Sequence, residues 1–292
     1  MKNPRKILSV ALAVLGTCCL LAATWLIFRI QAEDRHSRQT FESLQASGSG
    51  GTDLSDPDSR ASDPPETSDE ASEGASEPAS ESEPEPEPEP VENPYQESFL
   101  ANADMAAWLQ IPDTAINYPV MWTPRDEEYY LRRGFDGSRD RNGCLILDTD
   151  SCVDPLTTNL IIHGHNMKSG TMFGTLSDYE SEDFYLEHKN ISLHTRERQH
   201  NYEVIAVFFS QVYKKSDKVF KFYQFFQADT EAEFEDFYQN VKALSLYDTG
   251  VTAEFGDRFL TLSTCSYHVT NGRFVVVAKE IESGDTYLPF QE

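Results

Sequence analysis

Hydrophobic residues are distributed very unevenly along the chain, and their pattern divides it into three parts. From Ile7 to Phe28, 22 consecutive residues carry no charge, and a helix of that length spans the roughly 30 Å hydrocarbon core of a bilayer. From Gln31 to Pro94 the chain is rich in Ser, Glu, Asp, Pro and Ala. After Pro94, short apolar runs alternate with polar turns, as in a folded domain. We therefore predict a tip and membrane anchor over 1–30, a stalk over 31–94 and a folded domain over 95–292.

The apolar stretch is predicted to be an uncleaved anchor, with a cleavable signal peptide as the competing interpretation. The apolar region of a signal peptide is about 7 to 15 residues long. Here Trp25 to Phe28 continue the apolar run beyond Ala22 and Ala23, where cleavage would be expected. Basic residues flank the stretch on both sides, so their charge does not decide its orientation in the membrane.

Runs of β-branched and aromatic residues fill the part of the chain after Tyr95. Separated as they are by polar turns, they predict a mainly β domain of about eight strands closed into a barrel. The expected strands are Ile116–Val120, Cys144–Leu147, Asn159–Ile162, Asn190–His194, Tyr202–Phe209, Phe259–Leu262 and Phe274–Ile281.

Three segments are expected to form helices at the periphery of the barrel. Met105–Leu109 is predicted to end a short helix, and Thr171–Glu187 and Thr230–Leu246 are predicted to be helical. The third segment places several apolar side chains on one helical face, so we expect it to pack on the barrel. These side chains are Phe234, Phe237, Val241 and Leu244.

Most of the net charge of -25 is concentrated in one segment. Residues 50–92 contain 15 acidic residues and only one basic residue, Arg60, which leaves -14 in that segment. The rest of the chain is moderately acidic. Proteins that bind a nucleic acid duplex need a basic surface, and the sequence shows no such cluster. We therefore exclude nucleic acid as a partner.

The acidic segment is predicted to be a disordered stalk. All but three of the 34 aromatic residues lie beyond position 94, and four Glu-Pro pairs occupy positions 83–90. A segment of this composition cannot bury a core. The stalk over 31–94 has 64 residues, which could reach between roughly 40 Å as a coil and roughly 200 Å fully extended. We therefore interpret it as a spacer.

Three cysteines lie outside the apolar stretch, and Cys265 is the best placed of them to react. Cys144 lies in an apolar strand and Cys152 in the loop after it, so they are either buried hydrophobic residues or partners in a disulfide. Cys265 ends an apolar run and precedes a polar turn. Its side chain should therefore be accessible at the end of a strand.

Two histidines and an arginine also occupy strand ends. His163 and His165 directly follow the apolar strand Asn159–Ile162, and Arg273 opens the final strand. Two histidines in this spacing could begin a metal site that Cys265 or His268 completes. We expect no metal, because no acidic residue closely follows His165 to orient it.

Taken together, these motifs closely resemble the sortase family, over essentially all of residues 95–292. The resemblance rests on Thr-Leu-Ser-Thr-Cys at 261–265, His-Gly-His at 163–165 and Gly-Arg-Phe at 272–274, with arginine eight residues after cysteine. Trp-Leu-Gln-Ile-Pro at 108–112 extends it. Tyr-Pro-Val at 118–120, Tyr-Tyr-Leu at 129–131 and the helix before the cysteine strand resemble class B.

The resemblance implies a role for each of these residues. Cys265 would be the nucleophile, His165 the catalytic histidine, and Arg273 the arginine that stabilises the carbonyl oxygen or holds the peptide, with Ser263 near the substrate. Family members often carry Tyr before the Gly-His pair, whereas this chain has His163, which is the alternative catalytic histidine. No cofactor is implied.

The same resemblance implies a cysteine transpeptidase on the surface of a Gram-positive cell. It would cleave a C-terminal sorting motif of the Asn/Ser-Pro-x-Thr-Gly/Asn type in secreted proteins and join them to an amine of a peptidoglycan precursor or a pilin. The catalytic domain would then be extracellular. The alternatives are a hydrolytic cysteine peptidase and a non-catalytic surface-binding domain on a stalk.

Overall fold

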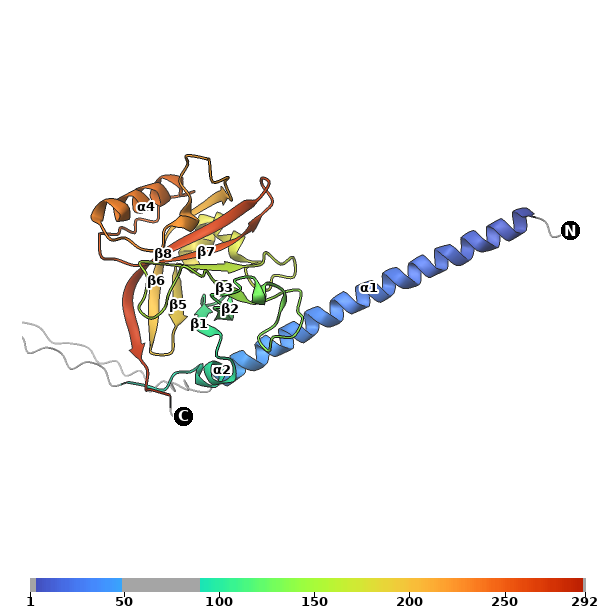
Figure 1. Cartoon of the computed structure of the whole chain (residues 1–292), viewed down its shortest axis with the longest axis horizontal. Coiled ribbons are helices and arrows are strands. Elements are labelled where there is room, and N and C mark those ends of the chain that lie inside the picture. The colour runs from blue at the N-terminus through green and yellow to red at the C-terminus, as the bar shows by residue number, and fades with distance from the viewer. Residues whose placement is uncertain (1–3, 49–89, 291–292) are drawn as a thin grey trace, which may run out of the picture.

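Eight strands close into a barrel in the computed structural model, which describes residues 4–48 and 90–290 (Figure 1). Around the barrel the order is β1-β2-β3-β4-β7-β8-β6-β5. The strands are β1 (Met105–Gln110), β2 (Asn117–Met121), β3 (Leu145–Leu147), β4 (Asn159–Gly164), β5 (Asn190–His194), β6 (Arg198–Gln211), β7 (Phe259–Ser266) and β8 (Gly272–Thr286). The predicted mainly β barrel is confirmed.

Helices are few, and they lie outside the barrel (Figure 1). The α-helices are α1 (Pro4–Gly48), α2 (Gln96–Ala101), α3 (Glu182–Glu187) and α4 (Glu231–Leu244), and the 3-10 helices are η1 (Tyr129–Arg132), η2 (Leu176–Glu180) and η3 (Phe222–Gln224). The segment predicted as one helix over Thr171–Glu187 is η2 followed by α3, with Ser181 between them in an extended conformation.

The prediction of a helix ending at Met105–Leu109 is wrong, because this segment is strand β1. A short apolar run does not reveal its secondary structure by periodicity alone. Here both edges of the segment find partners, since β1 pairs in antiparallel fashion with β2 and with β5. These neighbours satisfy its backbone hydrogen-bonding groups, and Trp108 and Leu109 become fully buried.

Helix α4 covers the outer face of the barrel, as its pattern predicted. Phe234, Phe237 and Val241 pack with Phe259 in a cluster separate from the barrel interior. Thr230 caps the helix, because its side chain accepts from the Glu233 backbone N–H while the Glu233 side chain accepts in return. Leu244, at the helix end, is 44% exposed.

Helix α1 does not end where the apolar stretch ends. It continues to Gly48, and its last four turns pack on the barrel. The Phe41 ring lies edge-on against Tyr118 at 5.2 Å, and the Gln45 amide donates to the Asn117 carbonyl oxygen at 2.6 Å. Residues 31–48, predicted as the start of the stalk, are therefore helical, because Phe41 finds a tertiary partner there.

The end of α1 lies beside the point where the described chain resumes. Gly48 packs so closely on the Tyr95 ring that a Cβ atom there would lie 2.7 Å from it. The fold also begins before the predicted boundary at Tyr95, since Val91 pairs with Tyr287 and the buried Asn93 amide donates to the Thr195 carbonyl oxygen. Within the predicted stalk over 31–94, residues 49–89 lie outside the described residues, and α1 itself connects the apolar stretch to the barrel.

The first prediction tests the packing of α1 on the barrel. Phe41→Ala in the full chain should release the last turns of α1, because it removes a buried ring worth about 3 kcal/mol. Backbone amides of residues 34–48 should then exchange with solvent about 100-fold faster, as measured by hydrogen exchange and mass spectrometry. Glu42→Ala, on the exposed side of the same turn, is the control. Unchanged protection in Phe41→Ala would show that the helix does not depend on this contact.

Candidate active site

Cys265 and Arg273 face each other across two neighbouring strands. In the antiparallel pair of β7 and β8, Cys265 is the direct partner of Arg273. Directly opposed residues in such a pair project from the same face of the sheet. Leu262 and Phe274 belong to the barrel core, so alternation along each strand places Cys265 and Arg273 on the outer face. Both are partly exposed there.

A tight turn between the strands explains the eight-residue spacing of this pair. The turn runs from Ser266 to Gly272, and the Gly272 N–H donates to the Val269 carbonyl oxygen at 3.1 Å. Asn271 has a φ of 58°, in the left-handed region that asparagine tolerates. At Gly272 a Cβ atom would collide with the Ser266 carbonyl oxygen, so only glycine fits. The turn chemistry thus aligns Arg273 with Cys265.

Strand β4, which runs parallel to β7, brings His165 close to the end of β7 where Cys265 lies. In the β4–β7 ladder, His163 pairs with Ser263 and Gly164 pairs with Thr264. His165 is the next residue, and therefore lies at the level of Cys265. The following residue fixes this placement, because the Asn166 side-chain amide donates to the Cys265 carbonyl oxygen at 2.8 Å. Within the described residues, His165 and Cys265 share no direct hydrogen bond.

The orientation of the His165 ring is set from another part of the chain. Its Nε2 lies 2.8 Å from the carbonyl oxygen of Leu131, at the end of the Tyr-Tyr-Leu motif in η1. A carbonyl oxygen only accepts, so Nε2 carries the hydrogen and Nδ1 is the nitrogen with a lone pair in the neutral ring. The Leu131 carbonyl therefore selects one tautomer of His165.

The Arg273 guanidinium has no acidic partner among the residues that the structure describes. Its Nη1 donates to the Gly272 carbonyl oxygen at 3.0 Å, within its own turn. None of the described ion pairs includes it. A positive charge that no carboxylate neutralises is available to an oxyanion or a peptide carbonyl.

Ser263 lies two residues before Cys265 on the same face, but it is 2% exposed. Its Oγ makes no hydrogen bond within the described residues. Burying a hydroxyl without a hydrogen bond costs about 1–3 kcal/mol, so Ser263 Oγ is suited to bind a further polar group.

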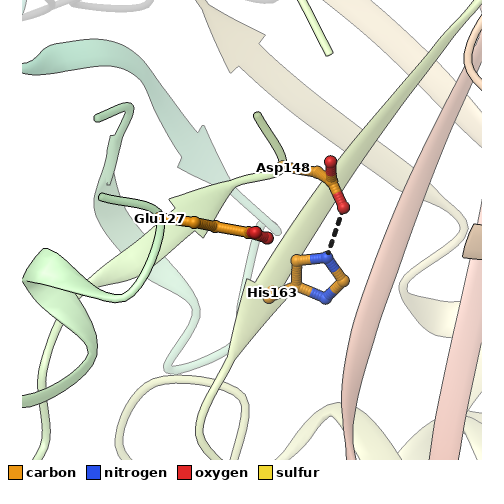
Figure 2. Close-up of side chains that lie close together, drawn as sticks. All are labelled: Glu127, Asp148 and His163. Atoms are coloured by element: carbon orange, nitrogen blue, oxygen red, sulfur yellow. Dashed lines mark hydrogen bonds and ion pairs between the residues drawn. The ribbon is translucent and has the colours of Figure 1, made fainter. Parts of the chain in front are cut away.

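His163 is less well placed than His165 to act on Cys265. It pairs with Ser263 in the β4–β7 ladder, two residues before His165 in the chain. Its Nε2 lies 3.2 Å from Asp148 Oδ2 (Figure 2). Glu127 approaches the same pair. Neither acid was predictable from the sequence, because the two residues come from separate loops. The only signal in the sequence was that Asp148 directly follows an apolar strand.

The other candidate residues, Cys144, Cys152 and His268, make different contacts. Cys144 is 2% exposed, and burial raises the pKa of its thiol far above the usual value. Cys152 contacts the Asp154 carbonyl oxygen, and both cysteines are free thiols in the structure. His268 pairs with Ser266 in the exposed turn after β7.

A family model and several known proteins are similar to this chain. A family model described as "Sortase domain" matches residues 109–281. Sortase B of Listeria monocytogenes is 34% identical over 184 residues, which cover 61% of this chain and 70% of that protein. Sortase B of Staphylococcus aureus is 31% identical over 183 residues, which cover 62% of this chain and 72% of that protein.

Solved structures show the same similarity in three dimensions. A Staphylococcus aureus sortase B–substrate complex aligns with a TM-score of 0.59 at 28% identity, covering 66% of this chain and 87% of that chain. The crystal structure of sortase B from Bacillus anthracis in complex with AAEK1 aligns with a TM-score of 0.57 at 31% identity, covering 66% of this chain and 86% of that chain.

The second prediction concerns access to the thiols. In the folded chain at neutral pH, iodoacetamide should alkylate Cys265 about 100-fold or more faster than Cys144, because only Cys265 reaches solvent. Peptide mapping by mass spectrometry gives the two rates. In denaturant the rates should converge, which serves as the control. Equal rates in the folded protein would contradict the placement of Cys265 on the outer face.

Proposed function

The chain belongs to the sortase family of cysteine transpeptidases, and we propose that Cys265, His165 and Arg273 form its active site on the outer face of the barrel. The observation that carries this proposal is the strand register. It sets Cys265 directly opposite Arg273, and the Asn166 hydrogen bond holds the His165 segment at the same level. Three separate parts of the chain thus bring a thiol, an imidazole and a guanidinium to the same place on the outer face.

In the first half of the reaction, the Cys265 thiolate attacks the carbonyl carbon of the sorting peptide. The thiolate is far more nucleophilic than the thiol, and a nearby arginine and a protonated histidine both favour it. The carbonyl π electrons move onto oxygen as the C–S bond forms. When the C–N bond breaks, protonated His165 donates its proton from Nδ1 to the departing amine, and a thioester remains on Cys265.

In the second half, an acceptor amine attacks the thioester. Neutral His165 removes a proton from the amine through Nδ1 as the new C–N bond forms. The C–S bond then breaks, which returns the Cys265 thiolate. The Leu131 carbonyl oxygen suits both halves of the cycle, because it binds Nε2–H whether the ring is neutral or protonated.

Arg273 supplies the positive charge on which both halves depend. Each tetrahedral intermediate carries a negative oxygen, and a donor fixed in position beforehand stabilises that oxygen more than it stabilises the neutral carbonyl. The guanidinium is always charged, and in the described residues no carboxylate pairs with it. We assign it to the oxyanion, with a peptide-holding role as the alternative that kinetics can separate.

The substrate is proposed to be a secreted protein with a C-terminal sorting motif of the Asn/Ser-Pro-x-Thr-Gly/Asn type. The acceptor would be an amine of a peptidoglycan precursor or a pilin. Two observations support a peptide on this face: one similar structure is described as a sortase B–substrate complex, and Ser263 has a buried hydroxyl without a partner in the described residues. We propose that Ser263 contributes to substrate binding.

The apolar part of α1 is compatible with a single membrane crossing. We propose that the tip and anchor over 1–30 hold the catalytic domain over 95–292 outside the cell, with residues 31–94 between them. In this arrangement, Phe28 lies only about 9 Å along the helix axis from Asp34. Asp34 pairs with Arg141 of the barrel domain at 3.0 Å, so the barrel domain would lie close to the membrane surface.

The third prediction tests the nucleophile. Cys265→Ala should abolish both cleavage of a sorting-motif peptide and its transfer to an added amine, because no thioester can form. Cys152→Ala, which removes another partly exposed thiol, should keep parent activity. Mass spectrometry can follow the transfer product and the hydrolysis product separately. Parent-rate cleavage by Cys265→Ala would refute the assignment, and hydrolysis that added amine never diverts would indicate a peptidase.

The fourth prediction separates charge from geometry at Arg273. Arg273→Ala should lower kcat by about 100-fold or more, as expected for the loss of one preorganised donor. Arg273→Lys keeps the charge but loses the planar fork, so it should recover only part of the rate. A rise in KM with unchanged kcat would instead indicate peptide holding. Parent values of both constants in Arg273→Ala would defeat both roles.

A further inference from the structure

Three side chains from separate segments converge beside the proposed active site. Glu127 precedes η1, Asp148 directly follows β3, and His163 lies in β4. One potential ligand atom from each lies within 4.8 Å of the other two. Figure 2 shows both carboxylates turned toward the His163 ring.

We propose that Glu127, Asp148 and His163 form a binding site for a divalent transition-metal ion such as Zn²⁺ or Mn²⁺. One imidazole nitrogen and two carboxylate oxygens are ligands that these ions accept, whereas Ca²⁺ and Mg²⁺ prefer oxygen alone. With bonds of about 2.0–2.2 Å, three ligand atoms around one ion lie about 3–4 Å apart. Side-chain rotations would therefore bring the three atoms closer together than the present 4.8 Å limit when the ion binds.

The charges in this cluster favour a cation. Within the described residues, neither carboxylate forms an ion pair with a lysine or an arginine, and His163 is the partner of Asp148. A bound divalent ion would offset the repulsion between the two carboxylates.

Ser263 supplies a second, independent observation. It pairs with His163 in the parallel β4–β7 ladder, so the two side chains project from the same face. Its Oγ is buried and makes no hydrogen bond within the described residues. A buried hydroxyl without a partner in the described residues, on the same face as His163, is suited to bind the ion or a water molecule on it.

The ion would connect two segments that both determine the orientation of His165. Glu127 lies four residues before Leu131, whose carbonyl oxygen binds His165 Nε2. His163 lies two residues before His165 in the chain. An ion shared by Glu127 and His163 would therefore hold the Leu131 segment against β4. Binding of the ion does not depend on the proposed function, whereas this effect on His165 does.

The experiment measures Mn²⁺ binding to the full chain in detergent by electron paramagnetic resonance, in which only free Mn²⁺ gives the sharp signal. Mn²⁺ has little affinity for thiolates, so the ion should avoid Cys265. We expect one ion per chain, with Zn²⁺ competing and Ca²⁺ failing to compete at equal concentration. At 100 times Kd, the ion should raise Tm by about 5–10 °C.

Four variants locate the site. His163→Tyr introduces the residue that family members often carry there, and Asp148→Asn keeps the shape of the side chain without its charge. Each should weaken Mn²⁺ binding by about 10-fold or more. Glu128→Gln removes the acid next to Glu127 and should change Kd by less than about twofold. Cys265→Ala should bind Mn²⁺ like the parent, so the metal site can stand even if the proposed nucleophile fails.

Three results would overturn the proposal. Absence of saturable Mn²⁺ binding at millimolar concentration would show that the cluster is an ordinary polar surface. Binding that persists unchanged in both His163→Tyr and Asp148→Asn would place the ion elsewhere, as an adventitious ion only. Displacement of Mn²⁺ by equimolar Ca²⁺ would refute the assignment to a transition metal.

Discussion

The alignment of β4, β7 and β8 is the constraint on which the rest of the site depends. Strand β7 lies between the other two, parallel to β4 and antiparallel to β8. Because side chains alternate between faces, a shift of one residue in either pair would turn the cysteine or its neighbours into the barrel core. The buried residues on the inner face, among them Leu262 and Phe274, prevent that shift. The hydrophobic core thus holds the register of the polar outer face.

The polar groups on that face are not mutually satisfied. Within the described residues, Arg273 lacks an acidic partner, Ser263 Oγ lacks a hydrogen bond, and Glu127 lies near a second carboxylate. Of these groups only the Ser263 hydroxyl is buried, so its burial alone costs folding free energy. The partly exposed guanidinium and the exposed carboxylate are suited to bind an oxyanion, a peptide or a cation.

The position of the barrel relative to the apolar helix depends on a different contact. The acidic composition of residues 50–92 predicts a long spacer between the two. The packing of Phe41 on Tyr118, and of Gly48 on Tyr95, instead places the end of the helix against the barrel. Because α1 is continuous from the apolar stretch to this contact, the helix itself connects the apolar stretch to the barrel.

Much of this protein could be derived from its sequence. The apolar stretch, the strand runs, the amphipathic helix α4 and the motifs around Cys265, His165 and Arg273 are local patterns, and local patterns report secondary structure and chemistry directly. The strand nature of Met105–Leu109, the packing of residues 31–48 and the approach of Glu127 and Asp148 to His163 were not predictable in this way. Each depends on partners distant in the sequence, and only closure of the barrel decides which distant residues become neighbours.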